Sequence, residues 1–129
     1  MTVSGAESKQ LIGRYLQALS GQAKPPALVA RFVSDPSLAE HIRQVEAAFP
    51  FYELIAEDVM AEGDLVAMRG TFHGVHGGPF AGIEATGRAV TADLMIFYRV
   101  EGDRIVQHWL QFDAAGLIAQ LTAPVAASA

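Results

Sequence analysis

The segment from residue 105 to residue 113 combines the side chains best suited to chemistry. It holds a histidine, a tryptophan, two glutamines and an aspartate. Because successive side chains of a β-strand point to opposite faces, His108 would share one apolar face with Leu110 and Phe112. The other face would hold Ile105, Gln107, Trp109, Gln111 and Asp113. Either face could look into a ligand pocket, and the sequence leaves that choice open.

Asp113 and His108 are the candidate catalytic residues. A carboxyl group whose pKa is raised by apolar surroundings can remove a proton from the carbon next to a carbonyl group and later return it. A histidine, which titrates near neutral pH, can assist. Each residue also has a structural interpretation, because an aspartate before an apolar run commonly caps a helix and a histidine on an apolar face is commonly just hydrogen-bonded.

Other aromatic and polar residues are candidates for ligand binding. The indole N–H of Trp109 could orient a carbonyl group, and the hydroxyl of Tyr15 could reach a cavity. His73 and His76 lie close together in a glycine-rich stretch, but a metal site needs a third converging ligand, so we expect no metal. The expected substrate-binding residues are Trp109, His73, His76, Tyr15, Phe97 and Gln111.

Composition excludes several classes of function. The chain has no cysteine, which excludes thiolate nucleophiles, disulfides, zinc ribbons and iron–sulfur ligation. The net charge is −5 and no basic run is present, so we expect no nucleic-acid partner. No secretory signal opens the chain and no stretch approaches the roughly eighteen apolar residues of a membrane span, so we expect a cytoplasmic protein without a membrane partner.

The N-terminal third has the pattern of three helices. Ser4 and Glu7 form a possible capping box before an apolar stripe at helical spacing. Asp35 followed by Pro36 predicts a later helix start, because proline suits the first helical turn. Pro50 ends that helix. The expected helices cover roughly residues 5–20, a short segment around 28–33, and 36–49.

The rest of the chain has the pattern of an antiparallel β-meander. The tripeptide Glu-Gly-Asp at 62–64 and again at 101–103 predicts two tight hairpins, in which glycine takes a positive φ. A long irregular connection is expected over 74–87. Asp113 could cap a last helix, and we expect a frayed tail over 122–129. The strands are predicted at about 51–61, 65–73, 88–100 and 104–112.

These elements define an α+β fold. The length of 129 residues and the 51% hydrophobic content indicate a single domain over 1–129. Three N-terminal helices would pack on the concave face of a curved antiparallel sheet, with a short C-terminal helix at its end. Such a cone closes at one end and leaves a pocket at the other.

Two motifs carry a resemblance to a known family. The first is GTFHGVHGGPFAGI, from Gly70 to Ile83, followed by TGRAVT at 86–91. The second is the run from His108 through Asp113 to Leu117. Together they resemble the SnoaL-like polyketide and ester cyclases over roughly residues 49–121. The N-terminal third is less similar to that family and is shorter between the second and third helices.

The resemblance implies an NTF2-like cone with a buried pocket, often dimeric, and without a metal or an organic cofactor. Members of this family close rings by intramolecular aldol chemistry, with an aspartate near the end of the last strand as acid and base. That aspartate corresponds either to Asp113 or to position 110, where this chain has Leu110. We therefore expect cofactor-independent acid–base chemistry on a small apolar carbonyl compound, carried out by a homodimer. The alternative is a non-catalytic ligand-binding or dimerisation module on the same fold.

Overall fold

Three helices form the N-terminal third, as the sequence predicts. The computed structural model describes residues 4–124. The three helices are α1 (Gly5–Leu19), α2 (Pro26–Phe32) and α3 (Pro36–Ala48). The Ser4 side chain accepts a hydrogen bond from the Glu7 backbone N–H at the start of α1. Asp35 does the same for α3, where its carboxylate accepts from the first backbone N–H groups of the helix.

A four-stranded antiparallel sheet follows, in the strand order β1-β2-β3-β4. Both predicted hairpins are present, and Gly63 and Gly102 at their tips have φ values of 58° and 64°. These positive angles explain why glycine occupies both turns. The strands are β1 (Glu53–Glu62), β2 (Leu65–Val75), β3 (Ala89–Glu101) and β4 (Arg104–Phe112), and α4 (Ala114–Thr122) completes the chain. Thr122, expected in a frayed tail, ends this helix, and residues 125–129 of that tail lie outside the described residues.

A β-bulge changes which face of the sheet the Ile105 side chain points to. Strict alternation places Ile105 on the same face as Trp109, and that expectation is wrong. Arg99 pairs with Gln107 and Val100 pairs with Ile105, so one extra residue lies in β4 between the two pairs. The bulge shifts the alternation, and Ile105 is fully buried on the inner face.

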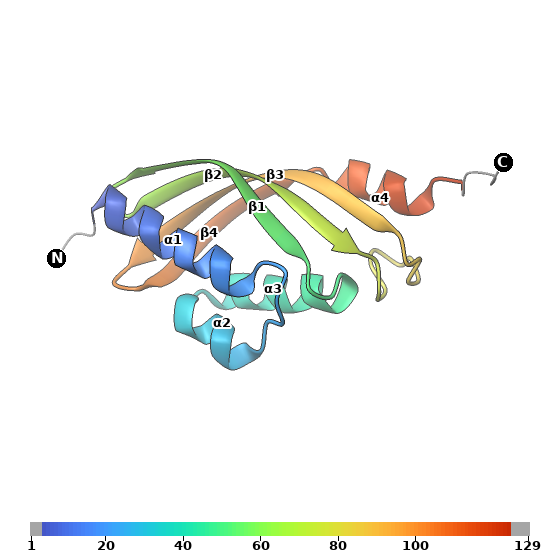
Figure 1. The fold of residues 1–129 in the computed structure, drawn as a ribbon, viewed down its shortest axis with the longest axis horizontal. Helices are drawn as coiled ribbons and strands as arrows, with labels where there is room; N and C mark the ends of the chain where they lie inside the picture. The colour runs from blue at the N-terminus through green and yellow to red at the C-terminus, as the bar shows by residue number, and fades with distance from the viewer. Residues whose placement is uncertain (1–3, 125–129) are drawn as a thin grey trace.

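The helices cover one face of the arched sheet. Figure 1 shows α1, α2 and α3 on the same side of the sheet, with α4 extending at the end opposite the start of α1. Contacts join α1 to β1 and β2, α2 to β4, and α4 to β3. Alternate residues of β3 are buried along its whole length, which is the pattern of a sheet covered on one face only. The core therefore lies between the helices and the concave face.

The glycine-rich connection after β2 is tied to the end of α3. The backbone N–H groups of Gly77 and Gly78 both donate to the carbonyl oxygen of Ala48. A Cβ atom on Gly78 would lie only 2.3 Å from the Ala47 carbonyl oxygen, so this close approach requires glycine. The connection thereby fixes the distance between the sheet and α3, the two walls of the interior.

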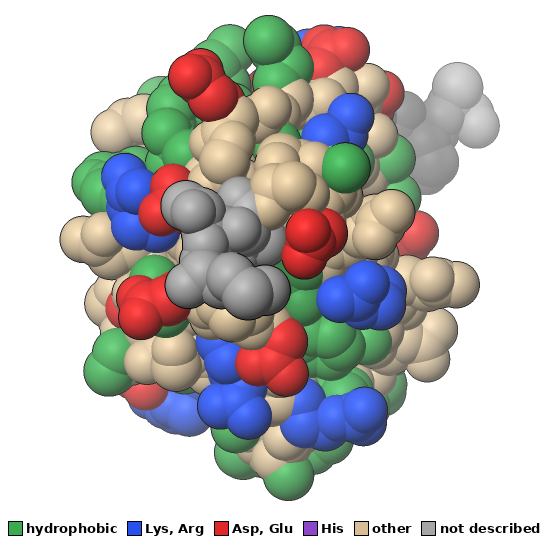
Figure 2. Space-filling model, turned by 90° about the vertical axis from the view of Figure 1, so that its left-hand side faces the viewer, with side chains coloured by type: hydrophobic (Ala, Val, Ile, Leu, Met, Phe, Trp, Pro, Cys, Tyr) green, Lys and Arg blue, Asp and Glu red, His purple; other side chains and the backbone are tan. Residues whose placement is uncertain are grey.

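Charged groups of both signs are mixed on the surface. Figure 2 shows acidic and basic side chains interspersed on the face at the α1 end of the molecule, without a continuous basic patch on that face. None of the helices among residues 4–124 is long and apolar enough to cross a membrane.

Candidate active site

A cavity of about 100 Å³ lies between α3 and the inner face of the sheet. Its lining includes side chains from α1, α3 and α4 and from all four strands. Nearly all of these are aliphatic or phenyl groups. Four of the lining residues have polar side-chain atoms: Tyr15, His41, Tyr52 and Tyr98. The chain contains only three tyrosines, and all three line this cavity.

His108 lies on the inner face of β4, next to residues of the cavity lining but not itself part of that lining. Its neighbour on that face, Leu110, lines the cavity, and so does its cross-strand partner Tyr98. His108 Nδ1 lies 2.8 Å from Oδ2 of Asp35, the residue that caps α3. Only 13% of the His108 side chain and 10% of the Asp35 side chain are exposed. The sheet and a helix start, 73 residues apart in the chain, thus form a buried histidine–carboxylate pair.

The protonation of Asp35 follows from its contacts. Desolvation acts to raise the pKa of this carboxyl group, but the hydrogen bonds from His108, from the Ser37 side chain and from the backbone N–H groups of Ser37 and Leu38 outweigh it. The pKa therefore lies below its ordinary value, and the carboxylate is ionised at neutral pH.

The ionised Asp35 fixes the tautomer of His108. A carboxylate only accepts hydrogen bonds, so Nδ1 must be the nitrogen that carries the proton. In the neutral ring, Nε2 then has the free lone pair. Among residues 4–124 no hydrogen bond to His108 Nε2 is found, so this nitrogen is available as a base.

His41 is a second histidine at the site. It lies on α3, in the apolar stripe that also holds Leu38, Ile42 and Val45, and it lines the cavity. Burial lowers its pKa below the ordinary value, and the positive charge that His108 can carry lowers it further. His41 is therefore uncharged at neutral pH and can accept a proton or a hydrogen bond from a ligand.

Tyr15 and Tyr98 lie against each other at the cavity wall. Their ring centroids are 5.8 Å apart in an edge-to-face arrangement. Burial raises the pKa of Tyr15, and the nearby Tyr98 hydroxyl opposes that rise. Burial also raises the pKa of Tyr98, well above its ordinary value. Both phenols therefore stay protonated and can act only as neutral hydrogen-bond groups.

Asp113 lies away from the cavity. Its Oδ1 accepts a hydrogen bond from the Gly116 backbone N–H at 2.8 Å, which caps α4. The residue is exposed and borders a separate shallow cleft on the outer side of the sheet, next to Arg69, Asp93 and Gln111. At position 110, the other possible place of the family aspartate, Leu110 faces the cavity.

The structure distributes the expected substrate-binding residues over three places. Tyr15 lines the cavity. His76 is fully buried in the glycine-rich connection, where its Nδ1 accepts a hydrogen bond from the Thr86 backbone N–H, and it does not line the cavity. The other four lie on the outer face of the sheet or are exposed there: Trp109, Phe97, Gln111 and His73.

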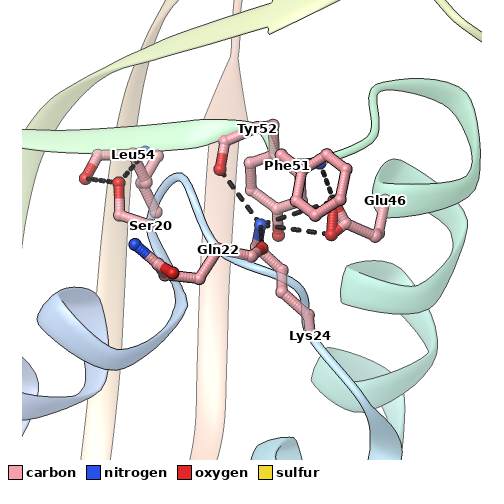
Figure 3. A network of polar contacts seen from close by, with 7 residues as sticks. All are labelled: Ser20, Gln22, Lys24, Glu46, Phe51, Tyr52 and Leu54. Atoms are coloured by element: carbon pink, nitrogen blue, oxygen red, sulfur yellow. Dashed lines mark hydrogen bonds and ion pairs between the residues drawn. The ribbon is translucent and has the colours of Figure 1, made fainter.

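A different buried ion pair lies behind the cavity wall at the start of β1. Figure 3 shows Lys24 beneath Tyr52, with Glu46 of α3 beside it. The ammonium group donates to the carbonyl oxygens of Gln22 and Tyr52, at 2.9 and 3.0 Å, and lies 3.2 Å from Glu46 Oε2. It also lies 4.1 Å from the centroid of the Tyr52 ring. Glu46 in turn accepts from the Phe51 backbone N–H. The network connects the segment after α1 to α3 and β1.

No metal centre is formed by the part of the chain that the structure describes. No group of three or more histidine, aspartate or glutamate side chains there is arranged to hold an ion. The pair His73 and His76 does not converge, because His73 is exposed and His76 is buried.

Three residues of this site were missed in the sequence. The sequence indicates only a helix start at Asp35, and the sequence reasoning above does not point to His41 or Tyr98. His41 could have been noticed, since it interrupts the apolar stripe of α3 three residues after Leu38. No local pattern connects Asp35 to His108, because only the tertiary fold brings them together.

Comparison with known proteins identifies the class. The model of the SnoaL-like polyketide cyclase family matches residues 21–121. The chain therefore belongs to this family. None of the curated proteins searched is similar enough to count as a relative.

Solved structures show the same fold. AclR from Streptomyces galilaeus, described as a candidate hydroxylase, is 25% identical with a TM-score of 0.78, covering 92% of this chain and 82% of that one. TsrD from Streptomyces laurentii is 28% identical with a TM-score of 0.74, covering 92% and 97%. A hypothetical protein from Catenulispora acidiphila with a ketosteroid isomerase-like fold is 14% identical, with a TM-score of 0.68, covering 89% and 94%. The NTF2-like α+β fold expected from the sequence is thus confirmed.

Proposed function

We propose that this protein catalyses cofactor-independent proton transfer on a small apolar carbonyl compound, in an aldol cyclisation or a related isomerase or lyase reaction. Its membership of the SnoaL-like family supports a role of the cyclase or isomerase type. The apolar cavity suits a compact, weakly polar substrate. The two histidines at the site supply ring nitrogens that can accept and return a proton.

The proposed chemistry starts at His108. Its Nε2 lone pair takes a proton from the carbon next to the substrate carbonyl group, the C–H electron pair forms the enolate C=C bond, and the carbonyl π electrons move onto the oxygen. Asp35 stabilises the positive charge that the imidazole ring then carries, because its carboxylate accepts from Nδ1. In a cyclisation the enolate carbon attacks a second carbonyl group, and the imidazolium then gives its proton to the new alkoxide. In an isomerisation the imidazolium instead gives its proton to a different carbon of a conjugated dienolate.

One observation carries this proposal. The 2.8 Å contact between His108 Nδ1 and Asp35 Oδ2 leaves the other ring nitrogen free as a base, and His108 has the lining residues Leu110 and Tyr98 as its neighbours on the inner face of the sheet.

The test is hydrogen exchange at carbon. Cyclohexanone in D₂O exchanges its α-protons slowly, and ¹H NMR follows the loss of signal. We expect the protein to accelerate this exchange, and His108→Gln to reduce the acceleration by roughly 100-fold or more. No acceleration by the intact protein, or full acceleration by the variant, would contradict the assignment.

Asp113→Asn is the matched comparison for the carboxylate that the family resemblance indicates. Because Asp113 caps α4 and lies outside the cavity, we expect this variant to retain the exchange activity. A loss of exchange in correctly folded Asp113→Asn, with His108→Gln still active, would instead place the acid–base group at Asp113.

A non-catalytic ligand-binding module is the second candidate. The observation in its favour is Leu110, an apolar side chain that faces the cavity at one of the two possible places of the family aspartate. Binding of cyclohexanone without any accelerated exchange would support this candidate.

We also propose that two copies associate through the outer face of the sheet. Phe97 and Trp109 are cross-strand partners there, and they are 46% and 48% exposed. Met60 and Met95 on the same face are 73% and 62% exposed. An exposed apolar area of this kind commonly marks an interface, and most homo-oligomers are twofold dimers. Light scattering coupled to size exclusion should give the dimer mass for the intact protein and the monomer mass for Phe97→Asp.

A further inference from the structure

The hydroxyl group of Tyr98 is buried without a hydrogen-bond partner. Tyr98 has 0% exposure. Its Oη is one of two side-chain atoms in the described part of the chain that are buried without such a partner, and the other is His76 Nε2 in the glycine-rich connection. Leaving a buried hydroxyl unpaired is costly, so such groups normally have a partner.

Of the two residues with such an unpaired atom, Tyr98 lines the cavity and His76 does not. Replacing tyrosine with phenylalanine at this position would fill the same space without an unpaired oxygen. The rest of the cavity wall is almost entirely apolar, so the hydroxyl has no reason to be there for packing. An acceptor on a bound ligand would supply the missing partner.

The second cavity hydroxyl supports the same interpretation. Tyr15 lies edge-to-face with Tyr98, and a contact between the two hydroxyls that falls short of hydrogen-bond geometry lowers the pKa of Tyr15 and raises that of Tyr98. Two neutral phenol donors next to each other form a suitable site for a carbonyl oxygen, on which negative charge increases during enolisation.

The position of Tyr98 relative to His108 fits the geometry of an enolisable ketone. The two residues are direct cross-strand partners on the inner face of β3 and β4. Directly opposed residues of antiparallel strands have Cβ atoms about 5 Å apart. The carbonyl oxygen and the α-hydrogen of a ketone lie on adjacent carbons, so a hydrogen-bond donor and a base from neighbouring strands can contact both.

We propose that the Tyr98 hydroxyl, with Tyr15 beside it, binds the carbonyl oxygen of the substrate, and that the substrate is a compact ketone whose remaining surface is apolar. This inference rests on the proposed proton-transfer function, and it adds the residue that positions the substrate and the feature that the substrate must carry. A hydrocarbon of the same shape leaves the hydroxyl unpaired and should bind more weakly.

A matched pair of probes tests this inference. Cyclohexanone and methylenecyclohexane have nearly the same shape and differ in one oxygen acceptor. NMR titration of the intact, full-length protein gives the dissociation constant of each. We expect Tyr98→Phe to weaken cyclohexanone binding about fivefold, the typical contribution of one neutral hydrogen bond, and to leave methylenecyclohexane binding unchanged or tighter. Equal changes for both probes would overturn the proposal.

The carbonyl group itself gives a spectroscopic readout. Hydrogen bonding lowers the stretching frequency of ¹³C-labelled cyclohexanone, so the bound ketone should absorb at lower frequency in the intact protein than in Tyr98→Phe. Tyr15→Phe should give a smaller shift in the same direction. Thr71→Val is the control, because it removes a hydroxyl that donates to Glu57 on the outer face. A frequency that is the same in the intact protein and in Tyr98→Phe contradicts the inference.

Stability separates a ligand contact from an internal structural role. Without ligand, Tyr98→Phe should unfold at the same temperature as the intact protein or at a higher one, because it removes an unpaired buried oxygen. A lower unfolding temperature would show that the hydroxyl serves the fold, and would overturn the proposal. Failure of the exchange assay with selective ketone binding intact would instead contradict only the proton-transfer function.

Discussion

The two buried ion pairs of this protein differ in what they leave unpaired. At the start of β1, the three N–H donors of Lys24 all have acceptors, namely two backbone carbonyl oxygens and Glu46. Only 1% of the Lys24 side chain is exposed. At the cavity, His108 uses one ring nitrogen for Asp35 and keeps the other free.

This difference indicates how the same type of interaction can serve stability or chemistry. A lysine with every donor paired holds three segments of chain together and offers nothing to a ligand. A histidine whose orientation is fixed through one nitrogen presents the other in a defined position and tautomer. The comparison predicts that changes at Lys24 affect folding, and that changes at Asp35 affect activity more than folding.

Lys24→Met should have the largest effect on stability. It leaves the Glu46 carboxylate without its cation and two carbonyl oxygens without a donor, and breaking such a buried pair costs about 3 kcal/mol. Urea denaturation should show this loss in the free energy of unfolding. The exchange activity per folded molecule should be unchanged, and a selective loss of activity would contradict the structural role of Lys24.

A second substitution sharpens this result. The double variant Lys24→Met with Glu46→Gln removes the uncompensated charge while keeping an oxygen for the Phe51 N–H. It should recover part of the lost stability, and an additive loss in the double variant would mean that the two charges do not interact.

Asp35→Asn should give a smaller loss of stability and a clear loss of activity. Asparagine keeps an oxygen for the helix cap but loses the charge, so we expect about 1 kcal/mol in the free energy of unfolding. Because the amide no longer fixes the tautomer of His108, the exchange rate should fall at least tenfold. Unchanged exchange would remove Asp35 from the site.

The decrease in the free energy of unfolding at acidic pH provides a second test of the Asp35 carboxyl group. The pKa of Asp35 is lowered in the folded state, so the unfolded chain binds more protons just below the ordinary value of 3.8. The contribution of Asp35 is thus present above pH 4 and is lost as the pH falls through the folded value. Asp35→Asn should flatten this part of the curve, measured by thermal unfolding at a series of pH values.

His41 should give a smaller effect in a different pH range. Its pKa is lowered by burial, so the unfolded chain binds more protons than the folded chain as the pH falls below the ordinary value of 6.5. The free energy of unfolding should therefore decrease on acidification from pH 6.5, and less so in His41→Gln. An identical pH dependence in the two proteins would contradict the neutral state of His41.

Arg43→Met should have the smallest effect and is the surface control for Lys24→Met. Arg43 pairs with Glu40 one turn away on α3, and both side chains are at least half exposed. Exposed pairs of this kind contribute little, so we expect no measurable change in unfolding or exchange.

The local sequence determined the elements of this fold and most of their boundaries. Ser4, Asp35 and Asp113 each cap the helix that follows, and Gly63 and Gly102 occupy the two hairpin turns. These features depend on a few neighbouring residues and on backbone sterics, which a single sequence shows directly. The alternation in β4 also placed His108, Leu110 and Phe112 on one face, although the bulge moved Ile105 to that face as well.

Only the tertiary structure decided which of the chemically capable residues meet. Asp35 reaches His108 because the chain between α2 and α3 lies beside β4, where Val33 forms a bridge with Ile105. The same packing leaves Asp113 capping α4 outside the cavity and turns Trp109 and Phe97 to the outer face. A contact between residues 73 positions apart depends on how helices and sheet pack, and the spacing of residues along the chain contains no record of it.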